Sequence, residues 1–315
     1  MKHGSFSQTV KEEITTFEYT NEQYLALLSG FIKTNGVVSI SSKKMVLSLQ
    51  TENSKIAKLI YKAILCVFHV SPQFSYSKKM KLDKCVIYHI NIYDKVEEIL
   101  KELQIADGFF PLTPKEILDN DNARFFISGV FLASGSVNPP TSSSYHLQMV
   151  VAKEEDAKFI IKLLNKYKYD KSMDFKYISR RNKYVVYLKK ADQISTFLAL
   201  VNAPITMLDF VNSRAEKDFI NNENRIQICF NANFQKSLLK SSEQIEDINL
   251  IKKKYGLVHL SEKEQEIANA RLENPEAPLS SLVTILKEKN IQISKSGISR
   301  IFNKFHDLAL TLRNK

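Results

Sequence analysis

The chain has 315 residues, of which 44% are hydrophobic and 25% are charged. This composition is typical of a globular protein, and the length is sufficient for two or three domains. Its 45 lysines and arginines exceed its 34 acidic residues, which gives a formal net charge of +11. This excess favours a polyanionic partner, nucleic acid first and an anionic membrane surface second. A basic protein without such a partner is the alternative.

Several classes of protein are excluded at this stage. No apolar run approaches the roughly 20 residues of a membrane helix, and the opening MKHGSFSQTVKEEITT lacks the apolar centre of a secretory signal. Cys66, Cys85 and Cys229 are far apart, and the histidines show no paired ligand spacing. This pattern argues against a disulfide framework and a zinc site. We therefore expect a cytoplasmic protein with no metal, no other cofactor and no membrane partner.

The first predicted helix ends in LLSGFIKTNG at 28–37, where an apolar segment runs into a glycine turn. Thr20 and Gln23 form a predicted capping box at its start. An alternating strand at 45–50 follows, and then a helix at 54–65 whose apolar residues recur at helical spacing. Two strands within 73–92 flank a basic turn, and a short helix at 94–105 closes the series.

The same series returns about one hundred residues later. ISGVFLASGS at 127–136 repeats the opening phrase, so that Ser29-Gly30 aligns with Ser128-Gly129 and Gly36 with Gly135. A strand at 145–151, a helix at 155–167, two strands within 174–190 and a helix at 191–202 follow in register. The pattern predicts an α+β fold with a duplicated αββαββα unit, the first repeat over 1–105 and the second over 106–215.

The small residues inside the two repeated helices need a physical reason. A glycine in a helix costs about 0.8–1 kcal/mol relative to alanine. Close approach of the two helices across a pseudo-twofold axis would supply that reason for Gly30 and Gly129. The alternative for a single Ser-Gly pair is a simple bend, and the repeated register favours the packing interpretation.

The C-terminal third reads differently. Residues 216–236 are polar and rich in asparagine without a sustained period, which predicts a linker. Residues 237–315 predict a helical domain, with one helix ending at Gly256 and a capping box at Ser261 and Glu264. A short helix follows Pro278, and Ser294 is the natural N-cap of the last helix.

The last helix has two distinct faces. Its apolar face consists of Ile298, Ile301, Phe302, Phe305 and Leu308, and its polar face consists of Lys295, Ser296, Ser299, Arg300, Asn303 and Lys304. A short turn between two helices, the second presenting basic and amide side chains, is typical of a helix-turn-helix. Arginine and asparagine can read base edges, and lysine mostly contacts phosphate. The alternative is a helical bundle with an ordinary solvated basic face.

The N-terminal domain carries two further basic clusters. The first predicted hairpin contains Lys78, Lys79, Lys81 and Lys84, and the equivalent second hairpin contains Arg180, Arg181 and Lys183. These clusters give the domain a basic surface of its own, and the resemblance of its fold to one whose sheets form a saddle over duplex DNA implies contacts with double-stranded DNA. Solvated hairpin turns are the alternative.

Two αββαββα units that meet on such helices resemble the LAGLIDADG homing-endonuclease fold. In that family the eighth motif position of each helix is a carboxylate that brings divalent metal to the scissile phosphates. Here these positions are Asn35 and Ser134. An amide and a hydroxyl are poor ligands for hard cations, so the resemblance implies a scaffold without catalytic residues.

The phrases SGFIKTNG, TENSKIAKLIYK, FLASGSVNPP and YHLQMVV together resemble the WhiA family more closely. NRIQICFNAN at 224–233 resembles the linker signature of that family, with Ile228 where asparagine is usual. The resemblance implies a non-enzymatic, nucleoid-associated DNA-binding protein of cell division and chromosome segregation, with transcription regulation as a further role. It also implies a cell-division or transcription protein as a partner of the N-terminal domain.

Two other interpretations remain open. One is an interaction scaffold in cell division with incidental DNA binding. The other is an active metal-dependent endonuclease, against which Asn35 and Ser134 argue.

Overall fold

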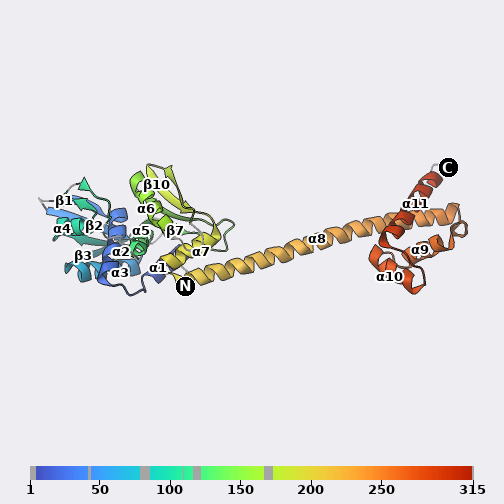
Figure 1. Cartoon of the computed structure of the whole chain (residues 1–315), viewed down its shortest axis with the longest axis horizontal. Coiled ribbons are helices and arrows are strands. Elements are labelled where there is room, and N and C mark those ends of the chain that lie inside the picture. The colour runs from blue at the N-terminus through green and yellow to red at the C-terminus, as the bar shows by residue number, and fades with distance from the viewer. Residues whose placement is uncertain are drawn as a thin grey trace. The chain divides into compact units, whose positions relative to one another are not determined.

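The structure is a computed structural model that describes residues 5–41, 44–78, 86–108, 110–115, 122–166 and 173–313. The chain divides into two compact units, Met1–Lys217 and Asp218–Lys315, and each is described by itself (Figure 1).

The first unit contains the predicted repeat. Its first half consists of α2 (Asn21–Asn35), β1 (Val37–Ser41), β2 (Lys44–Thr51), α3 (Ser54–Phe68), β3 (Gln73–Lys78), β4 (Val86–Ile92) and α4 (Val96–Glu102). After the short strands β5 (Ala106–Asp107) and β6 (Phe110–Pro111), the second half consists of α5 (Asn122–Ser134), β7 (Ser136–Val137), β8 (Leu147–Val151), α6 (Glu154–Lys166), β9 (Lys176–Arg180), β10 (Lys183–Leu188) and α7 (Ala191–Leu200). This order confirms the duplicated αββαββα fold.

The two halves build matching antiparallel sheets. The strand orders are β1-β2-β4-β3 and β7-β8-β10-β9, so equivalent strands occupy equivalent places. The pairs Leu47–Ile92 and Leu147–Leu188 lie at equivalent registers, and all four side chains are buried. Because successive side chains on a strand alternate between faces, each sheet covers the helices with one face and leaves the other outward.

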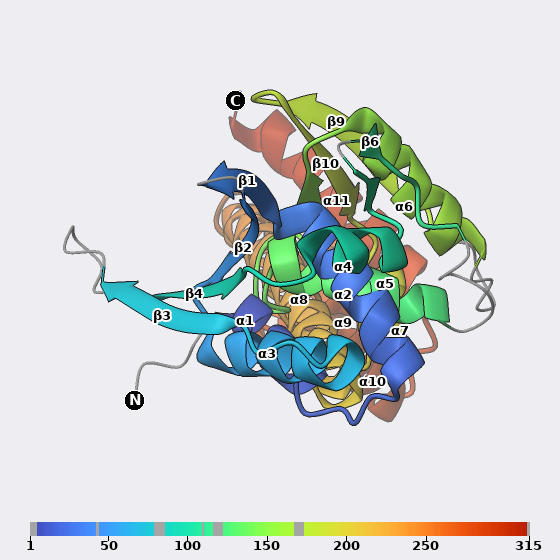
Figure 2. The ribbon, with the colours of Figure 1, turned by 90° about the vertical axis from the view of Figure 1, so that its left-hand side faces the viewer.

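Helices α2 and α5 lie side by side between the two sheets (Figure 2). A Cβ atom added at Gly30 would lie 2.1 Å from the backbone oxygen of Phe126, and one at Gly129 would lie 2.0 Å from that of Leu27. These contacts are related by the repeat, because Leu27 and Phe126 are equivalent residues. No side chain larger than hydrogen fits here, which confirms the predicted close approach. The predicted capping box at Thr20 and Gln23 also forms.

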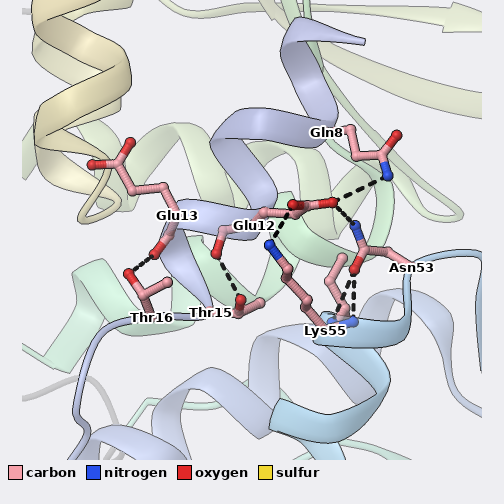
Figure 3. A network of polar contacts seen from close by, with 8 residues as sticks. Gln8, Glu12, Glu13, Thr15, Thr16, Asn53 and Lys55 are labelled. Carbon is pink, nitrogen blue, oxygen red and sulfur yellow. Dashed lines mark hydrogen bonds and ion pairs between the residues drawn. The ribbon is translucent and has the colours of Figure 1, made fainter. Parts of the chain in front are cut away.

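Helix α1 (Phe6–Ile14) precedes the repeat and was not predicted. Its Glu12 carboxylate accepts hydrogen bonds from Gln8, Asn53 and Lys55, which ties α1 to the start of α3 (Figure 3). Its Ser7 hydroxyl exchanges hydrogen bonds of 2.8 Å with the backbone of Val137 on β7. Helix α1 therefore contacts both halves of the repeat.

The long helix α8 (Pro204–Lys254) contains the segment predicted to be a linker. Residues 216–236 are helical, although their sequence shows no sustained period. The Glu13 carboxylate of α1 accepts hydrogen bonds from the backbone amides of Ile205 and Thr206 and so caps the first turn of α8. Once a first turn forms, each further residue costs little, so asparagine-rich sequence can continue a helix. The boundaries of the predicted domains stay a prediction.

The second unit is helical. The end of α8 is followed by a 3-10 turn (Leu257–His259), α9 (Glu262–Glu273), α10 (Leu279–Glu288) and α11 (Lys295–Arg313). Ile248 and Ile251 of α8 pack in one core with Leu282, Ile298 and Phe305. The predicted capping box at Ser261 and Glu264 forms, and the Ser294 hydroxyl accepts a hydrogen bond from the Gly297 amide at the start of α11.

The contact between α2 and α5 generates a first prediction. Gly30→Ala forces two backbones apart, and we expect a loss of about 3 kcal/mol in the free energy of unfolding. The matched control is Gly297→Ala in α11, where the added Cβ meets side-chain atoms and no backbone, with Ile293 at 2.8 Å and the Ser294 hydroxyl at 3.4 Å. There we expect a neutral effect or a gain of up to about 1 kcal/mol. Urea unfolding followed by circular dichroism measures both, and equal effects would contradict the packing argument.

Candidate nucleic-acid interface

Helix α11 presents one exposed polar face. Lys295, Ser296, Arg300 and Asn303 are exposed and Ser299 is half-buried, as residues three and four apart on one side of a helix should be. Ser296 shares a hydrogen bond with Ser294. Within the described part of the chain, the side chains of Lys295, Arg300 and Asn303 form no hydrogen bond or ion pair. These groups are therefore available for an external partner.

The opposite face holds α11 in place. Ile298, Phe302 and Phe305 are buried, and Ile301 and Leu308 are partly buried against the same core. Arg271 of α9 is 2% exposed, and its guanidinium lies 5.4 Å from the centre of the Phe302 ring. It donates hydrogen bonds to the backbone oxygens of Asn274 and Ala277, at 3.3 and 2.6 Å. One buried cation thus joins the turn before α10 to α11, a role that nothing in the sequence pattern indicated.

A second buried charge joins α8 to α11. The Asp247 carboxylate, 5% exposed, accepts from His306 at 2.7 Å and from Arg313 at 3.0 Å. Both partners lie in the later turns of α11, so the first turns stay free. The exposed polar face of α11 therefore belongs to a helix whose other side is packed and ion-paired within the second unit.

Lys304 has a contact within the protein that the sequence did not indicate. Its ammonium group lies 2.6 Å from the Glu264 carboxylate, which holds the pKa of that carboxyl below its ordinary value. Glu264 also accepts from Ser261 in the capping box of α9. Lys304 therefore bridges α11 to α9, because a neighbouring helix places a carboxylate within its reach. The other five residues of the predicted polar face lie on one side of α11, and their role stays a prediction.

In the first unit, α2 and α5 end at equivalent places. Asn35 accepts a hydrogen bond of 3.1 Å from the Gln50 amide of β2. Ser134 accepts one of 3.1 Å from the Val150 amide of β8. Each side chain ties the end of its helix to the adjacent sheet. Both positions are therefore occupied by neutral groups with a structural partner.

A polar cavity of about 730 Å³ lies beside these helix ends. Asn35, Ala133 and Gln50 line it together with Lys11 of α1. Burial lowers the pKa of Lys11 to about 8, so that its ammonium group is mostly charged at neutral pH. Across the described residues, no cluster of three or more His, Cys, Asp or Glu side chains could hold a metal ion. Glu52 is the one acid among the residues that line the cavity, and Lys11 is the one cation.

The outward faces of the two sheets differ in charge. In the second sheet, Arg180 lies directly opposite Lys183, and Lys176 and Lys189 share their face by strand alternation. Lys189 lies 5.5 Å from the centre of the Tyr187 ring on that face. Arg181 occupies the turn with a φ of 52°. The sequence reading found Arg180, Arg181 and Lys183 but missed Lys176 and Lys189, although their alternate spacing on predicted strands could have revealed them.

The equivalent face of the first sheet is uncharged over most of its described extent. It carries Ser75, Ser77, His89 and Asn91, and Ser77 lies 2.8 Å from His89. Lys78 ends β3 and is exposed. Lys79, Lys81 and Lys84 lie outside the described residues.

Two repeated αββαββα halves joined through glycine-bearing helices, followed by a helix-turn-helix, define a LAGLIDADG-like protein with a DNA-binding type of C-terminal domain. Residues 21–106 match the WhiA N-terminal LAGLIDADG-like domain, residues 123–220 the WhiA LAGLIDADG-like domain, and residues 224–309 the WhiA C-terminal HTH domain. The chain belongs to the WhiA family.

Relatives and a solved structure agree with this assignment. The chain is 39% identical over 314 residues to the "Probable cell division protein WhiA" of Lactobacillus acidophilus, covering 98% of this chain and 99% of that protein. It is 38% identical over 314 residues to the protein of the same name from Enterococcus faecalis, covering 99% of each. The crystal structure of full-length DUF199/WhiA from Thermatoga maritima has the same fold, with a TM-score of 0.57 at 22% identity over 98% of this chain and 99% of that one. Over the described residues, no helix is long and apolar enough to cross a membrane.

The buried ammonium group of Lys11 generates a prediction on pH. Its pKa is about 8 in the folded chain against an ordinary 10.5. Between these values the unfolded chain binds a proton that the folded chain does not, so stability falls as the pH decreases through this window, and the loss is complete below pH 8. Lys11→Met should remove this loss and raise stability at neutral pH by about 3 kcal/mol.

Urea unfolding at neutral pH and at steps between pH 8 and 10.5 measures this effect. The gain in the variant should shrink as the pH rises. Lys58→Met, at an exposed position on α3, is the matched control and should show no such trend. A gain that does not depend on pH would show that packing alone is responsible.

Proposed function

We propose that this protein is a non-enzymatic, double-stranded DNA-binding protein of bacterial cell division. We propose that it contacts the DNA bases mainly through α11. The observation that carries the proposal is the exposed face of Lys295, Ser296, Ser299, Arg300 and Asn303 on the first turns of an anchored helix. Helix-turn-helix proteins place these turns in the major groove. Arg300 and Asn303 suit guanine and adenine edges, and Lys295 suits phosphate.

The second sheet supports an additional contact with the DNA backbone. Arg180 and Lys183 face each other across β9 and β10, and like charges directly opposite each other are destabilising. No described carboxylate bonds either side chain, so an external anion would relieve their repulsion. We propose that this face, with Lys176, Lys189 and Arg181, meets phosphate. The uncharged face of the first sheet leaves room for a protein partner from cell division or transcription.

The absence of nuclease activity is also a proposal. Asn35 and Ser134 offer no negative charge, and both already accept a backbone hydrogen bond. Lys11 adds a positive charge to the cavity beside them. Metal-assisted phosphodiester hydrolysis needs ions that neutralise developing charge, and neither helix end offers such ions a carboxylate. Supercoiled plasmid should therefore stay intact with magnesium, and nicking that a chelator abolishes would overturn this part of the proposal.

The cellular role rests on the relatives. The curated proteins from Lactobacillus acidophilus and Enterococcus faecalis are named probable cell division proteins and match over nearly the whole chain. We propose the same role here, with association with the nucleoid in the cytoplasm, and with chromosome segregation and transcription regulation as its finer forms.

The first experiment is fluorescence anisotropy with duplex DNA across a salt series. Each phosphate neutralised contributes a slope of about −0.9 to the dependence of log affinity on log salt concentration. We expect a steep slope for the parent chain. Arg180→Ala with Lys183→Ala should reduce the slope by up to about 2 and weaken all sequences equally. An affinity of the parent that hardly changes with salt would sink the DNA-binding proposal.

A reader of base edges behaves differently from a phosphate contact. Arg300→Ala should cost about 1–3 kcal/mol on the preferred sequence and relax the preference at one position. Lys253→Ala, which removes an exposed cation from the end of α8, is the matched control and should leave the preference unchanged. Selection from a random duplex library with each variant measures both. If the Arg300 variant selected the parent sequence with the parent affinity, α11 would not be the reading helix.

A further inference from the structure

An apolar stripe runs along the part of α8 that belongs to the second unit. It consists of Phe219, Ile226, Phe230 and Phe234, whose side chains are 64%, 63%, 68% and 43% exposed. Their spacings of seven, four and four residues place them on one side of the helix. The rings of Phe230 and Phe234 are stacked at 6.4 Å. We call these four residues the α8 stripe.

The stripe differs from ordinary scattered surface residues. It continues, in the same helical phase, the face through which Ser241 and Ile248 pack into the second unit. Residues 226–235 carry no charge at all. Aromatic side chains can bury about 150–250 Å² each, so leaving three of them in water on a single helix is unfavourable. A helix with such an uncovered face is typical of one that packs against a partner.

The charges on either side of the stripe identify the partner. Residues 216–223 hold three acidic side chains and one lysine, whereas residues 225–240 hold three cations and no acid. Counted about the uncharged centre, residues 216–225 hold three acids and two cations, and residues 236–240 hold Lys236 and Lys240. The side before the centre is therefore net acidic, and the side directly after it is basic. A second copy in antiparallel orientation about Phe230 places Glu223 of each helix beside Lys236 and Lys240 of the other. A parallel copy would place like charges together.

The stripe is also self-complementary in that orientation. With Phe230 on the twofold axis, Phe230 meets its own counterpart and Ile226 comes level with Phe234 of the second copy. Glu223 comes level with Ser237, between Lys236 and Lys240. We propose that the α8 stripe is the interface of an antiparallel homodimer centred on Phe230.

The available area is consistent with this partner. Four large apolar side chains, each about half exposed or more, together with their flanks, supply roughly 500 Å² per copy. The total of roughly 1,000 Å² reaches the lower bound for a specific interface. The dimer would carry two helix-turn-helix domains at its two ends. From Phe230 to Ile248 an α-helix extends about 27 Å, so the two domains would lie about 54 Å apart along the pair. That spacing exceeds the half-site spacing of about 34 Å on one DNA face, and it favours two separate DNA segments.

Sedimentation equilibrium of the full-length chain tests the dimer. We expect a mass of twice the 36.2 kDa of one chain at micromolar concentrations and above. Phe230→Glu should give monomers, because it places two carboxylates together on the axis. Ile228→Glu is the matched control, since Ile228 is 67% exposed but points away from the stripe, and it should stay dimeric. A monomeric parent chain, or equal loss in both variants, would overturn the proposal.

Cysteine cross-linking tests the orientation. In a Cys229→Ser background, Phe230→Cys should form a covalent dimer on oxidation and Phe219→Cys should not. In a parallel dimer in register, both would cross-link, and that result would overturn the antiparallel arrangement. The background chain without a new cysteine is the control.

DNA binding separates this inference from the proposed function. On a duplex with a single site, Phe230→Glu should keep the affinity of the parent, because the stripe lies outside α11. If the variant were monomeric and bound DNA normally, the dimer proposal and the DNA-binding proposal would both stand. If the parent failed to bind DNA but formed the dimer, only the DNA-binding proposal would fall.

Discussion

The first unit depends on one contact, the approach of the α2 and α5 backbones at Gly30 and Gly129. A single Cβ atom at either position would lie about 2 Å from a carbonyl oxygen of the other helix. Gly30 meets Phe126 and Gly129 meets Leu27, and Leu27 and Phe126 are equivalent residues of the repeat. This approach therefore also sets the pseudo-twofold axis. The two sheets then take matching places, and the two helix ends come together beside one cavity. The buried Ser29 hydroxyl, 2.9 Å from the Leu103 oxygen, ties α2 to the end of its own repeat.

The same approach of α2 and α5 brings their C-terminal ends together, so the residues at these ends determine whether the scaffold can bind a metal. An arrangement that brings two helix ends together can concentrate charge, and in this chain it concentrates none that attracts a metal. Asn35 and Ser134 serve the fold by joining helix to sheet. Helix α1 adds Lys11 at the cavity and spans both repeats through Ser7 and Glu12. The helix ends thus serve as a structural joint. Among the described residues, Arg180 and Lys183 on the second sheet and Lys295 and Arg300 on α11 form no ion pair.

Much of this organisation could be predicted from the sequence because it is local or periodic. The constant offset between LLSGFIKTNG and ISGVFLASGS identified the duplication, and the capping boxes at Thr20 and Ser261 identified two helix starts. Helix α1 was missed because only Val10 and Ile14 of its residues are buried, which is too few for a period. The role of Lys304 was missed because Glu264 is forty residues away in the sequence. Lys11 acquires its environment only when α1 folds against α5.

Residues 216–236 show how propensity and tertiary context can differ in what they indicate. Sequence that is rich in asparagine and has no charge period indicates a linker when judged by propensity alone, since asparagine is a modest helix former. In the structure the segment continues a helix that starts at a capped first turn, and its phenylalanines then lie along one side together with Ile226. A flexible linker is not expected to carry phenylalanines at the same phase of a helix. A fully solvated helix is not expected to lack charged residues over ten positions. Both features are expected of a surface that another helix covers. In the proposed dimer the antiparallel copy of the same segment supplies this cover, because it places Glu223 of each chain beside Lys236 and Lys240 of the other.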